Sequence, residues 1–117
     1  MRVLVADDEP RLAKSMARML QADSHEYALA EDGLEAWALF ESAPDAWDLL
    51  ITDIRMPGLD GVGLARRIRD AGSAIPIVFV SGHGERPDIP ELKPATFLAK
   101  PFRRTELLAA IAPEELA

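Results

Sequence analysis

Four short apolar runs in this chain each stop at a residue that could do chemistry. In chain order, the polar residues at these points are Asp7 and Asp8, Asp53, Ser81 and Lys100. If the runs are parallel strands of one sheet, these side chains emerge together at its carboxyl edge. Three carboxylates, a hydroxyl and an ammonium gathered there make a site for a metal ion and a phosphoryl group.

The paired acids Asp7 and Asp8 also have a purely structural interpretation, because acidic residues before a helix can cap its N-terminus. Two carboxylates in succession that face a third, Asp53, fit that interpretation poorly. Like charges this close repel one another unless a cation neutralises them. Mg²⁺ takes a few oxygen ligands and keeps several waters, so it matches such a group.

The other three candidates have ordinary alternatives as well. Asp53 could merely initiate the turn at Pro57-Gly58, Ser81 could simply end a strand, and Lys100 could be a solvated surface lysine. Their common position at the ends of apolar runs favours the functional interpretation.

The composition is that of a globular domain. With 117 residues, 49% of them hydrophobic and 28% charged, the chain predicts one domain, residues 1–117, with a proper core. A net charge of −7 leaves no basic stripe for nucleic acid. No cysteine is present, and no apolar segment approaches membrane-spanning length, so a cytoplasmic protein without a membrane partner is expected.

Strand-like and helix-like segments alternate along the chain. The apolar runs predict strands at 3–6, 49–52, 77–80 and 97–99, with a weaker strand at 27–30, expected at an edge. Helical spacing appears after Pro10, again at Leu34, Trp37 and Phe40, and between the entry at Asp60-Gly61 and the stop at Gly72. A last helix is expected over about 103–111.

This alternation predicts right-handed βαβ crossovers and a parallel sheet covered on both faces. For five strands the flavodoxin-like, doubly wound α/β order 2-1-3-4-5 is the leading candidate, with the ligand crevice between the first and third strands. Asp8 and Asp53 would then lie on adjacent strand ends, roughly 5 Å apart in backbone terms.

The connection between the strands at 77–80 and 97–99, the fourth crossover, departs from the alternation of strands and helices. Pro87, Pro90 and Pro94 cannot all sit inside a normal helix. We expect at most one helical turn near residues 90–93, so this helix is degenerate and the connection is a mobile loop.

Four sequence elements together resemble the receiver domain of two-component response regulators, and the resemblance covers essentially the whole chain. They are Asp7-Asp8-Glu9-Pro10, the segment from Asp53 through Arg55-Met56-Pro57-Gly58 to Asp60-Gly61, Ser81-Gly82, and Lys100-Pro101-Phe102. The shortened fourth crossover resembles a subgroup of single-domain receivers in which a flexible loop replaces that helix.

The resemblance implies that Asp53 accepts a phosphoryl group from a phosphohistidine in a Mg²⁺-dependent reaction. Asp8 and Asp53 would bind the metal directly, Asp7 mainly through water, and the backbone carbonyl of Arg55 would complete the protein ligands. Lys100 would pair with the phosphoryl oxygens, and the family usually makes the Lys-Pro bond that follows it cis.

The resemblance also implies a switch. Ser81 would bond the phosphoryl group through its hydroxyl, and Phe97 lies at the position of the family's switch aromatic, although a Phe in a strand can equally be core. Arg55 and His83 lie at variable positions that flank the route of the hydrolytic water, and we expect them to tune the lifetime of the phosphorylated form. His25 is interpreted as a surface side chain.

The leading interpretation is a signalling receiver and not an enzyme that turns over substrate. Its expected partners are a sensor histidine kinase and a downstream protein or histidine phosphotransfer protein, with the receiver itself a monomer or weak dimer. Alternatives are an N-terminal receiver truncated from a longer transcription factor or hybrid kinase, or an intermediate in a phosphorelay. Met1 fits a native start and disfavours the C-terminal receiver of a hybrid kinase.

The sequence gives less support to two further classes of function. An aspartyl phosphatase generally carries a second acid two residues after its nucleophile, where this chain has Arg55. A receiver that acts without phosphorylation normally lacks the Asp or the Lys, and both are present here.

Overall fold

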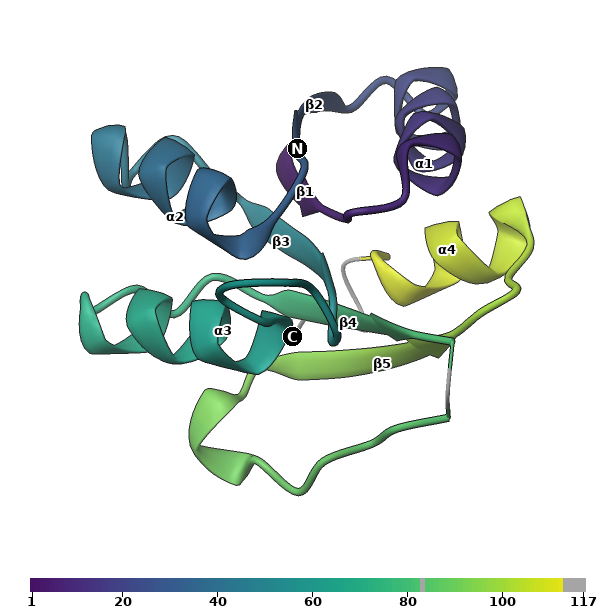
Figure 1. Ribbon diagram of the computed structural model, residues 1–117. Coiled ribbons are helices and arrows are strands. Elements are labelled where there is room, and N and C mark those ends of the chain that lie inside the picture. The colour runs from purple at the N-terminus through teal and green to yellow at the C-terminus, as the bar shows by residue number, and fades with distance from the viewer. Residues whose placement is uncertain (83, 113–117) are drawn as a thin grey trace.

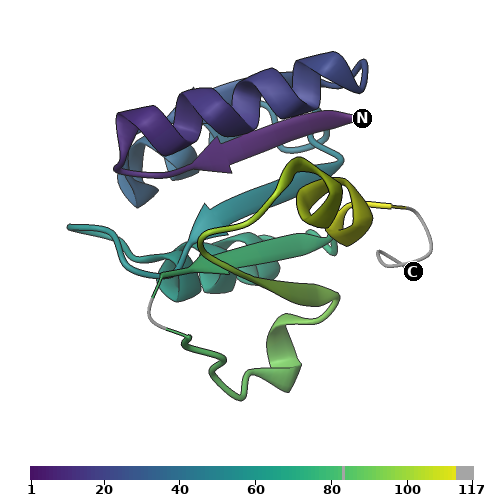
Figure 2. The ribbon, with the colours of Figure 1, turned by 90° about the vertical axis from the view of Figure 1, so that its right-hand side faces the viewer.

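The chain forms a five-stranded parallel sheet with helices on both faces (Figures 1 and 2). The computed structural model describes residues 1–82 and 84–112. Its strands are β1 (Arg2–Ala6), β2 (Glu26–Ala30), β3 (Leu49–Asp53), β4 (Ile77–Ser81) and β5 (Ala95–Ala99); its helices are α1 (Pro10–Ala22), α2 (Gly33–Ser42), α3 (Gly61–Asp70) and α4 (Arg104–Ala110). The order β2-β1-β3-β4-β5 confirms the predicted flavodoxin-like topology.

The strand register brings the ends of the central strands to one edge. Ala6 pairs with Thr52, Asp53 with Val80, and Ser81 with Ala99. The residues that follow β1, β3, β4 and β5 are therefore neighbours at the carboxyl edge. This register is what assembles the polar residues that the sequence scatters over four segments.

Two hydrophobic layers hold the sheet. Figure 1 shows α2 and α3 on one face of the sheet and α1 and α4 on the other. Leu4, Leu50 and Phe79 pack into the first layer, whereas Val5 and Ile51 pack into the second. Both β3 and β4 are buried along their full length, which explains why their sequences read as continuous apolar runs.

The helix entries follow the capping residues in the sequence. Pro10 occupies the first turn of α1, as predicted. The Asp32 carboxylate accepts from the Glu35 N–H and the Asp60 carboxylate from the Gly63 N–H, so both acids cap the helices that follow them. The last helix, α4, was predicted over 103–111 and is one residue shorter than this at both its start and its end.

The helical spacing of Leu34, Trp37 and Phe40 would place all three on one side of α2, but Leu34 is 52% exposed. Gly33, Ala36 and Phe40 point inward instead. A Cβ on Gly33 would collide with the backbone of Leu59, so the helix approaches that loop through its glycine. Leu34 follows one residue later, about 100° around the helix, and is turned outward.

The connection between β4 and β5 contains one 3₁₀ turn, η1 (Pro90–Leu92), and within the described residues no α-helix. This confirms the prediction of a degenerate fourth helix, and Figure 2 shows the connection as a loop standing off the sheet. Its far end is held by α3: Arg69 Nη2 donates to the Leu92 carbonyl at 2.9 Å, and Arg66 pairs with Glu91 at 2.9 Å.

Among the described residues, no helix has both the length and the apolar character needed to span a bilayer.

Candidate functional site

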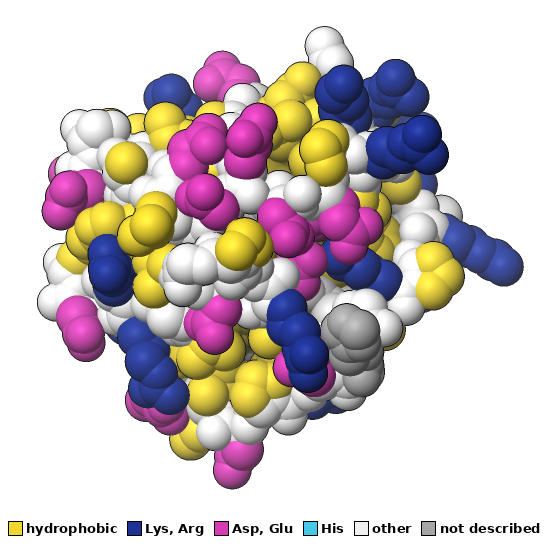
Figure 3. All heavy atoms as spheres, in the orientation of Figure 1, with side chains coloured by type: hydrophobic (Ala, Val, Ile, Leu, Met, Phe, Trp, Pro, Cys, Tyr) yellow, Lys and Arg dark blue, Asp and Glu magenta, His cyan; other side chains and the backbone are white. Residues whose placement is uncertain are grey.

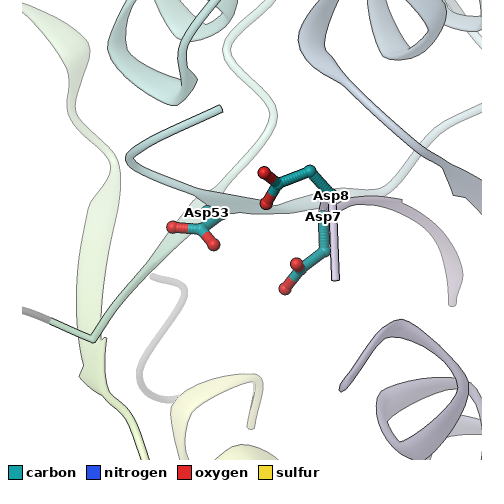
Figure 4. A group of neighbouring side chains, drawn as sticks. All are labelled: Asp7, Asp8 and Asp53. Carbon is teal, nitrogen blue, oxygen red and sulfur yellow. The ribbon is translucent and has the colours of Figure 1, made fainter. Parts of the chain in front are cut away.

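Three carboxylates lie next to one another at the carboxyl edge of the sheet (Figure 4). Asp7 and Asp8 follow β1 and Asp53 ends β3, and one oxygen from each lies within 4.8 Å of the others. Asp7 and Asp53 are buried, whereas Asp8 is exposed. The adjacency of Asp8 and Asp53 expected from the strand order is confirmed.

Asp7 is the most confined of the three acids. Its Oδ1 accepts from the Glu9 N–H at 2.8 Å, while Oδ2 is buried and receives no hydrogen bond from the described residues. Burial raises the pKa of Asp7 to about 6, against the opposing effects of that hydrogen bond and of Lys100. A buried carboxylate oxygen without a donor, next to two more carboxylates, has the chemistry of a divalent cation site.

Lys100 supplies the positive charge of the site. Its Nζ donates to Asp53 Oδ2 at 2.7 Å and to Glu9 Oε1 at 3.3 Å, and lies 3.7 Å from Asp7 Oδ2. Burial acts to lower the pKa of Lys100, but the hydrogen bond to Asp53 and the charges of Asp7 and Asp53 outweigh it, so the pKa is raised. The Lys100-Pro101 peptide is cis, as the resemblance implied.

A cavity of about 250 Å³ opens between these groups and is lined by Asp8, Glu9, Asp53, Arg55, Gly82 and Lys100. Figure 3 shows acidic side chains gathered on this face of the molecule, with Lys and Arg side chains among and beside them. An oxyanion can enter only if the acids are offset, and both Lys100 and a bound cation would serve that purpose.

Main-chain contacts fix the position of Asp53. The Asp53 Oδ1 atom accepts from the Arg55 N–H at 3.2 Å, and the Gly61 N–H donates to the Ile54 carbonyl at 2.9 Å. A Cβ on Gly61 would collide with the Asp53 carbonyl oxygen. Glycine is therefore required where α3 meets the end of β3.

Ser81 ends β4 at the same edge of the sheet, and Phe97 lies within the neighbouring strand β5. The Ser81 Oγ accepts from the Glu85 N–H at 3.1 Å. The half-buried ring of Phe97 stacks on Phe79 with centroids 5.4 Å apart, and the Arg86 guanidinium lies 5.3 Å from its centroid. Phe97 is thus partly core and partly surface. His83 lies outside the described residues.

Sequence reasoning missed two acids that the fold brings to this edge. Glu9 was only part of a motif, yet it contacts Lys100. Glu85 pairs with Arg55 across 30 residues, with Arg55 Nε 2.7 Å from Glu85 Oε1. The high charge of the motif could have indicated Glu9, whereas nothing local in the sequence indicates Glu85. His25 contacts Asp23 and the N-terminal amine, away from the site.

A doubly wound parallel sheet with an acidic pocket and a lysine at its carboxyl edge defines the CheY-like class of α/β domains. The chain belongs to the response regulator receiver domain family, whose model matches residues 3–112. Members of this family are phosphorylated signalling domains of two-component systems and bind Mg²⁺ at an acidic pocket.

Curated relatives agree with this assignment. Response regulator MprA of Mycobacterium avium (strain 104) is 36% identical over an alignment of 112 residues, and the match covers 93% of this chain and 48% of the relative. The protein of the same name in Mycobacterium leprae (strain TN) is 35% identical over an alignment of 114 residues, and the match covers 95% of this chain and 49% of the relative. The chain spans about half the length of these relatives.

Solved structures show the same fold. The receiver domain of the hybrid histidine kinase CckA is 33% identical with a TM-score of 0.83, and the match covers 100% of both chains. Vibrio cholerae CheY4 has a TM-score of 0.86 at 24% identity, covering 99% of this chain and 98% of its own. A CheX–CheY–BeF₃–Mg²⁺ complex from Borrelia burgdorferi matches with a TM-score of 0.84 at 25% identity, covering 93% and 84%.

Proposed function

We propose that this chain is a receiver that takes a phosphoryl group from the phosphohistidine of a sensor histidine kinase onto Asp53. One observation carries the proposal: the Asp53 carboxylate lines an open cavity, with the ammonium of Lys100 at 2.7 Å and the carboxylates of Asp7 and Asp8 beside it. An acceptor, a cation for the incoming oxygens and the ligands for a metal are within reach of one another.

The donor set fits Mg²⁺. Asp8 and Asp53 would hold the ion directly, the backbone carbonyl of Arg55 would add a third oxygen, and Asp7 would act through water. The buried Oδ2 of Asp7, without a donor among the described residues, is the observation that favours a cation here. When bound, the ion would offset the carboxylate charges and withdraw charge from the phosphoryl oxygens.

In the transfer step an oxygen of the Asp53 carboxylate attacks phosphorus in line with the leaving group. The new P–O bond makes an acyl phosphate, the P–N bond of the phosphohistidine breaks, and its imidazole leaves as the neutral base after taking up a proton. Lys100 meets a phosphoryl oxygen through a charge-assisted hydrogen bond. The chain acts as a phosphoacceptor, and water later returns the acyl phosphate to carboxylate and phosphate.

Ser81 and Phe97 serve as the switch, with the Ser81 hydroxyl bonding the phosphoryl group and Phe97 responding by packing alone. Arg55 and His83 tune the lifetime of the acyl phosphate. Support for Arg55 comes from its place in the lining of the cavity that contains Asp53. Timing phosphate loss in Arg55→Ala and His83→Ala tests this role, and an unchanged rate in both would remove it.

In this role residues 1–117 act as one receiver domain in the cytoplasm, a monomer or weak dimer without a nucleic-acid partner. Its output is a contact with a downstream protein. The same site would serve the receiver of a longer regulator, and the curated relatives, about twice as long as this chain, favour that alternative. Onward transfer to a histidine phosphotransfer protein would instead identify a phosphorelay intermediate.

Intact-mass measurement with acetyl phosphate and Mg²⁺, followed by peptide mapping of the adduct, tests the proposed function. We expect one phosphoryl group per chain, on Asp53, and none when EDTA replaces Mg²⁺. If no phosphoryl adduct forms at any time point, or if it maps to another residue, the proposal is contradicted.

A further inference from the structure

Three contacts hold the first part of the β4–β5 connection, residues 84–88, against the end of the sheet. The Glu85 carboxylate pairs with Arg55 at 2.7 Å, and the Glu85 N–H donates to Ser81 Oγ at 3.1 Å. The Arg86 guanidinium lies over the Phe97 ring at 5.3 Å. The three partners, Arg55, Ser81 and Phe97, are among the residues to which the proposed function gives tuning and switching roles.

We propose that Glu85 is a positioning residue that acts through Arg55. In the unphosphorylated protein Glu85 holds the guanidinium. When Asp53 carries a phosphoryl group, Arg55 exchanges Glu85 for the phosphoryl oxygens and residues 84–88 leave the site. This inference rests on the proposed function and adds to it the element that reports the phosphorylated state.

Charge and geometry favour this exchange. Arg55 and Asp53 line the same cavity, and the Arg55 N–H already bonds the Asp53 carboxylate. Phosphorylation raises the charge at this point from one negative charge to about two. Arg55 now bonds Glu85 through one Nε–Oε1 contact, whereas a guanidinium can bond two phosphoryl oxygens at once, so the phosphoryl group competes strongly with Glu85.

The existing ion pair is easily given up. The Arg55 side chain is 67% exposed and that of Glu85 30% exposed, and pairs this open to water contribute little to stability. Once Arg55 has turned away, the Glu85 carboxylate is left beside a phosphoryl group of like charge. Repulsion between the Glu85 carboxylate and the phosphoryl group then drives the segment away from the site, as the loss of the ion pair also does.

The second contact responds to the same event. The Ser81 oxygen that accepts the Glu85 N–H belongs to the hydroxyl proposed to bond the phosphoryl group. When the Ser81 side chain rotates about its Cα–Cβ bond to reach that group, its oxygen moves away from the Glu85 N–H. Beneath the segment, a cavity of about 60 Å³ is lined in part by Ser81, Arg86 and Phe97, so displacement of residues 84–88 opens the Phe97 ring to solvent.

The other end of the connection stays in place. Arg69 binds the carbonyls of Leu92 and Pro94, and Arg66 pairs with Glu91 at 2.9 Å, remote from the cavity at Asp53. Ile89 is buried in the core, and its carbonyl accepts from the Leu92 N–H at 3.0 Å, so movement is confined to residues 84–88. The Arg66–Glu91 pair also provides a matched control, because it joins the same two kinds of group at 50% exposure on the same connection.

NMR of the ¹⁵N-labelled chain, before and after addition of acetyl phosphate and Mg²⁺, tests the exchange. We expect the Arg55 Nε–H resonance to shift on phosphorylation and hydrogen exchange at the position-85 amide to rise about tenfold. In Glu85→Gln both changes should already be present in part without phosphodonor. In Glu91→Gln the two signals should match those of the wild type in both states.

Intact mass measured on the same samples separates the possible failures. If the phosphoryl group is taken up on Asp53 while both signals stay fixed, the inference is overturned and the proposed function stands. If the Glu91→Gln and Glu85→Gln variants behave alike, the inference is also overturned. If no phosphoryl group is taken up under these conditions, the proposed function falls and the inference with it.

Discussion

Lys100 Nζ lies 2.7 Å from Asp53 Oδ2 and joins the residue after β5 to the last residue of β3. The strand between them, β4, passes through the core and ends at Ser81. The ammonium therefore spans the edge of the sheet above β4 and brings the ends of three strands to one cavity. In the structure the Asp53 carboxylate holds the Lys100 ammonium, which the proposed function assigns to a phosphoryl oxygen.

Asp53→Asn should abolish labelling by acetyl phosphate, because the amide cannot act as the nucleophile that forms an acyl phosphate. Intact mass over a time course measures this. Asp48→Asn is the control: Asp48 bonds the Arg2 N–H at the opposite end of β3 and should leave labelling unchanged. Undiminished labelling of Asp53→Asn would refute the assignment of the acceptor.

Lys100→Gln should slow phosphoryl uptake about 100-fold, the usual effect of removing one group that stabilises developing charge. Mg²⁺ binding should persist because the three carboxylates remain. Lys93→Gln, at an exposed position, controls for the general loss of a positive charge. Equal labelling rates in the two variants would exclude a role for the Lys100 ammonium in transfer.

The pKa of Asp7 predicts a specific dependence of stability on pH. Because this pKa is raised from 3.8 to about 6, the folded state keeps its proton while the unfolded chain loses it as the pH rises between these values. The contribution of Asp7 to stability is thus most favourable below about pH 4 and is lost as pH rises through 6. The whole change amounts to about 3 kcal/mol.

Urea unfolding of the wild type and of Asp7→Asn in EDTA, from pH 4 to pH 7.5, measures this effect. As the pH rises, we expect the free energy of unfolding of Asp7→Asn to increase relative to that of the wild type, by up to about 3 kcal/mol. A difference between the two proteins that stays constant over this range would contradict the buried state of Asp7.

Mg²⁺ should stabilise the wild type by relieving repulsion among the carboxylates. At about ten times the dissociation constant the gain is about 1.4 kcal/mol, or about 5 °C in the midpoint of thermal unfolding for a domain of this size. In Asp8→Ala the shift of the unfolding midpoint caused by Mg²⁺ should be much smaller. In Asp48→Asn it should equal that of the wild type. Equal shifts in Asp8→Ala and the wild type, at matched ionic strength, would refute the metal site.

Much of the fold could be predicted because its signals are local. Continuous apolar runs such as Ile77-Val78-Phe79-Val80 indicated buried parallel strands, and Asp60 marked the start of α3. The proline spacing in the fourth crossover excluded a helix. Once the strand order was assumed, the meeting of Asp8, Asp53 and Lys100 followed from topology alone.

The missed features depend on contacts between distant loops. Leu34 has the spacing of a buried residue, but the close approach of Gly33 to Leu59 sets the rotation of α2. Glu85 and Arg55 have no periodic pattern around them, so only the folded chain reveals their pairing. The pKa of Asp7 likewise depends on burial, which spacing does not encode.

Gly61 bears on any attempt to transplant this chemistry. The start of α3 rests directly on the carbonyl of Asp53, where no side chain can intervene. A scaffold given only the acids and the lysine would set the acceptor at a different height and angle. A designed site would have to include the contact between the Gly61 main chain and the Asp53 carbonyl together with the reactive side chains.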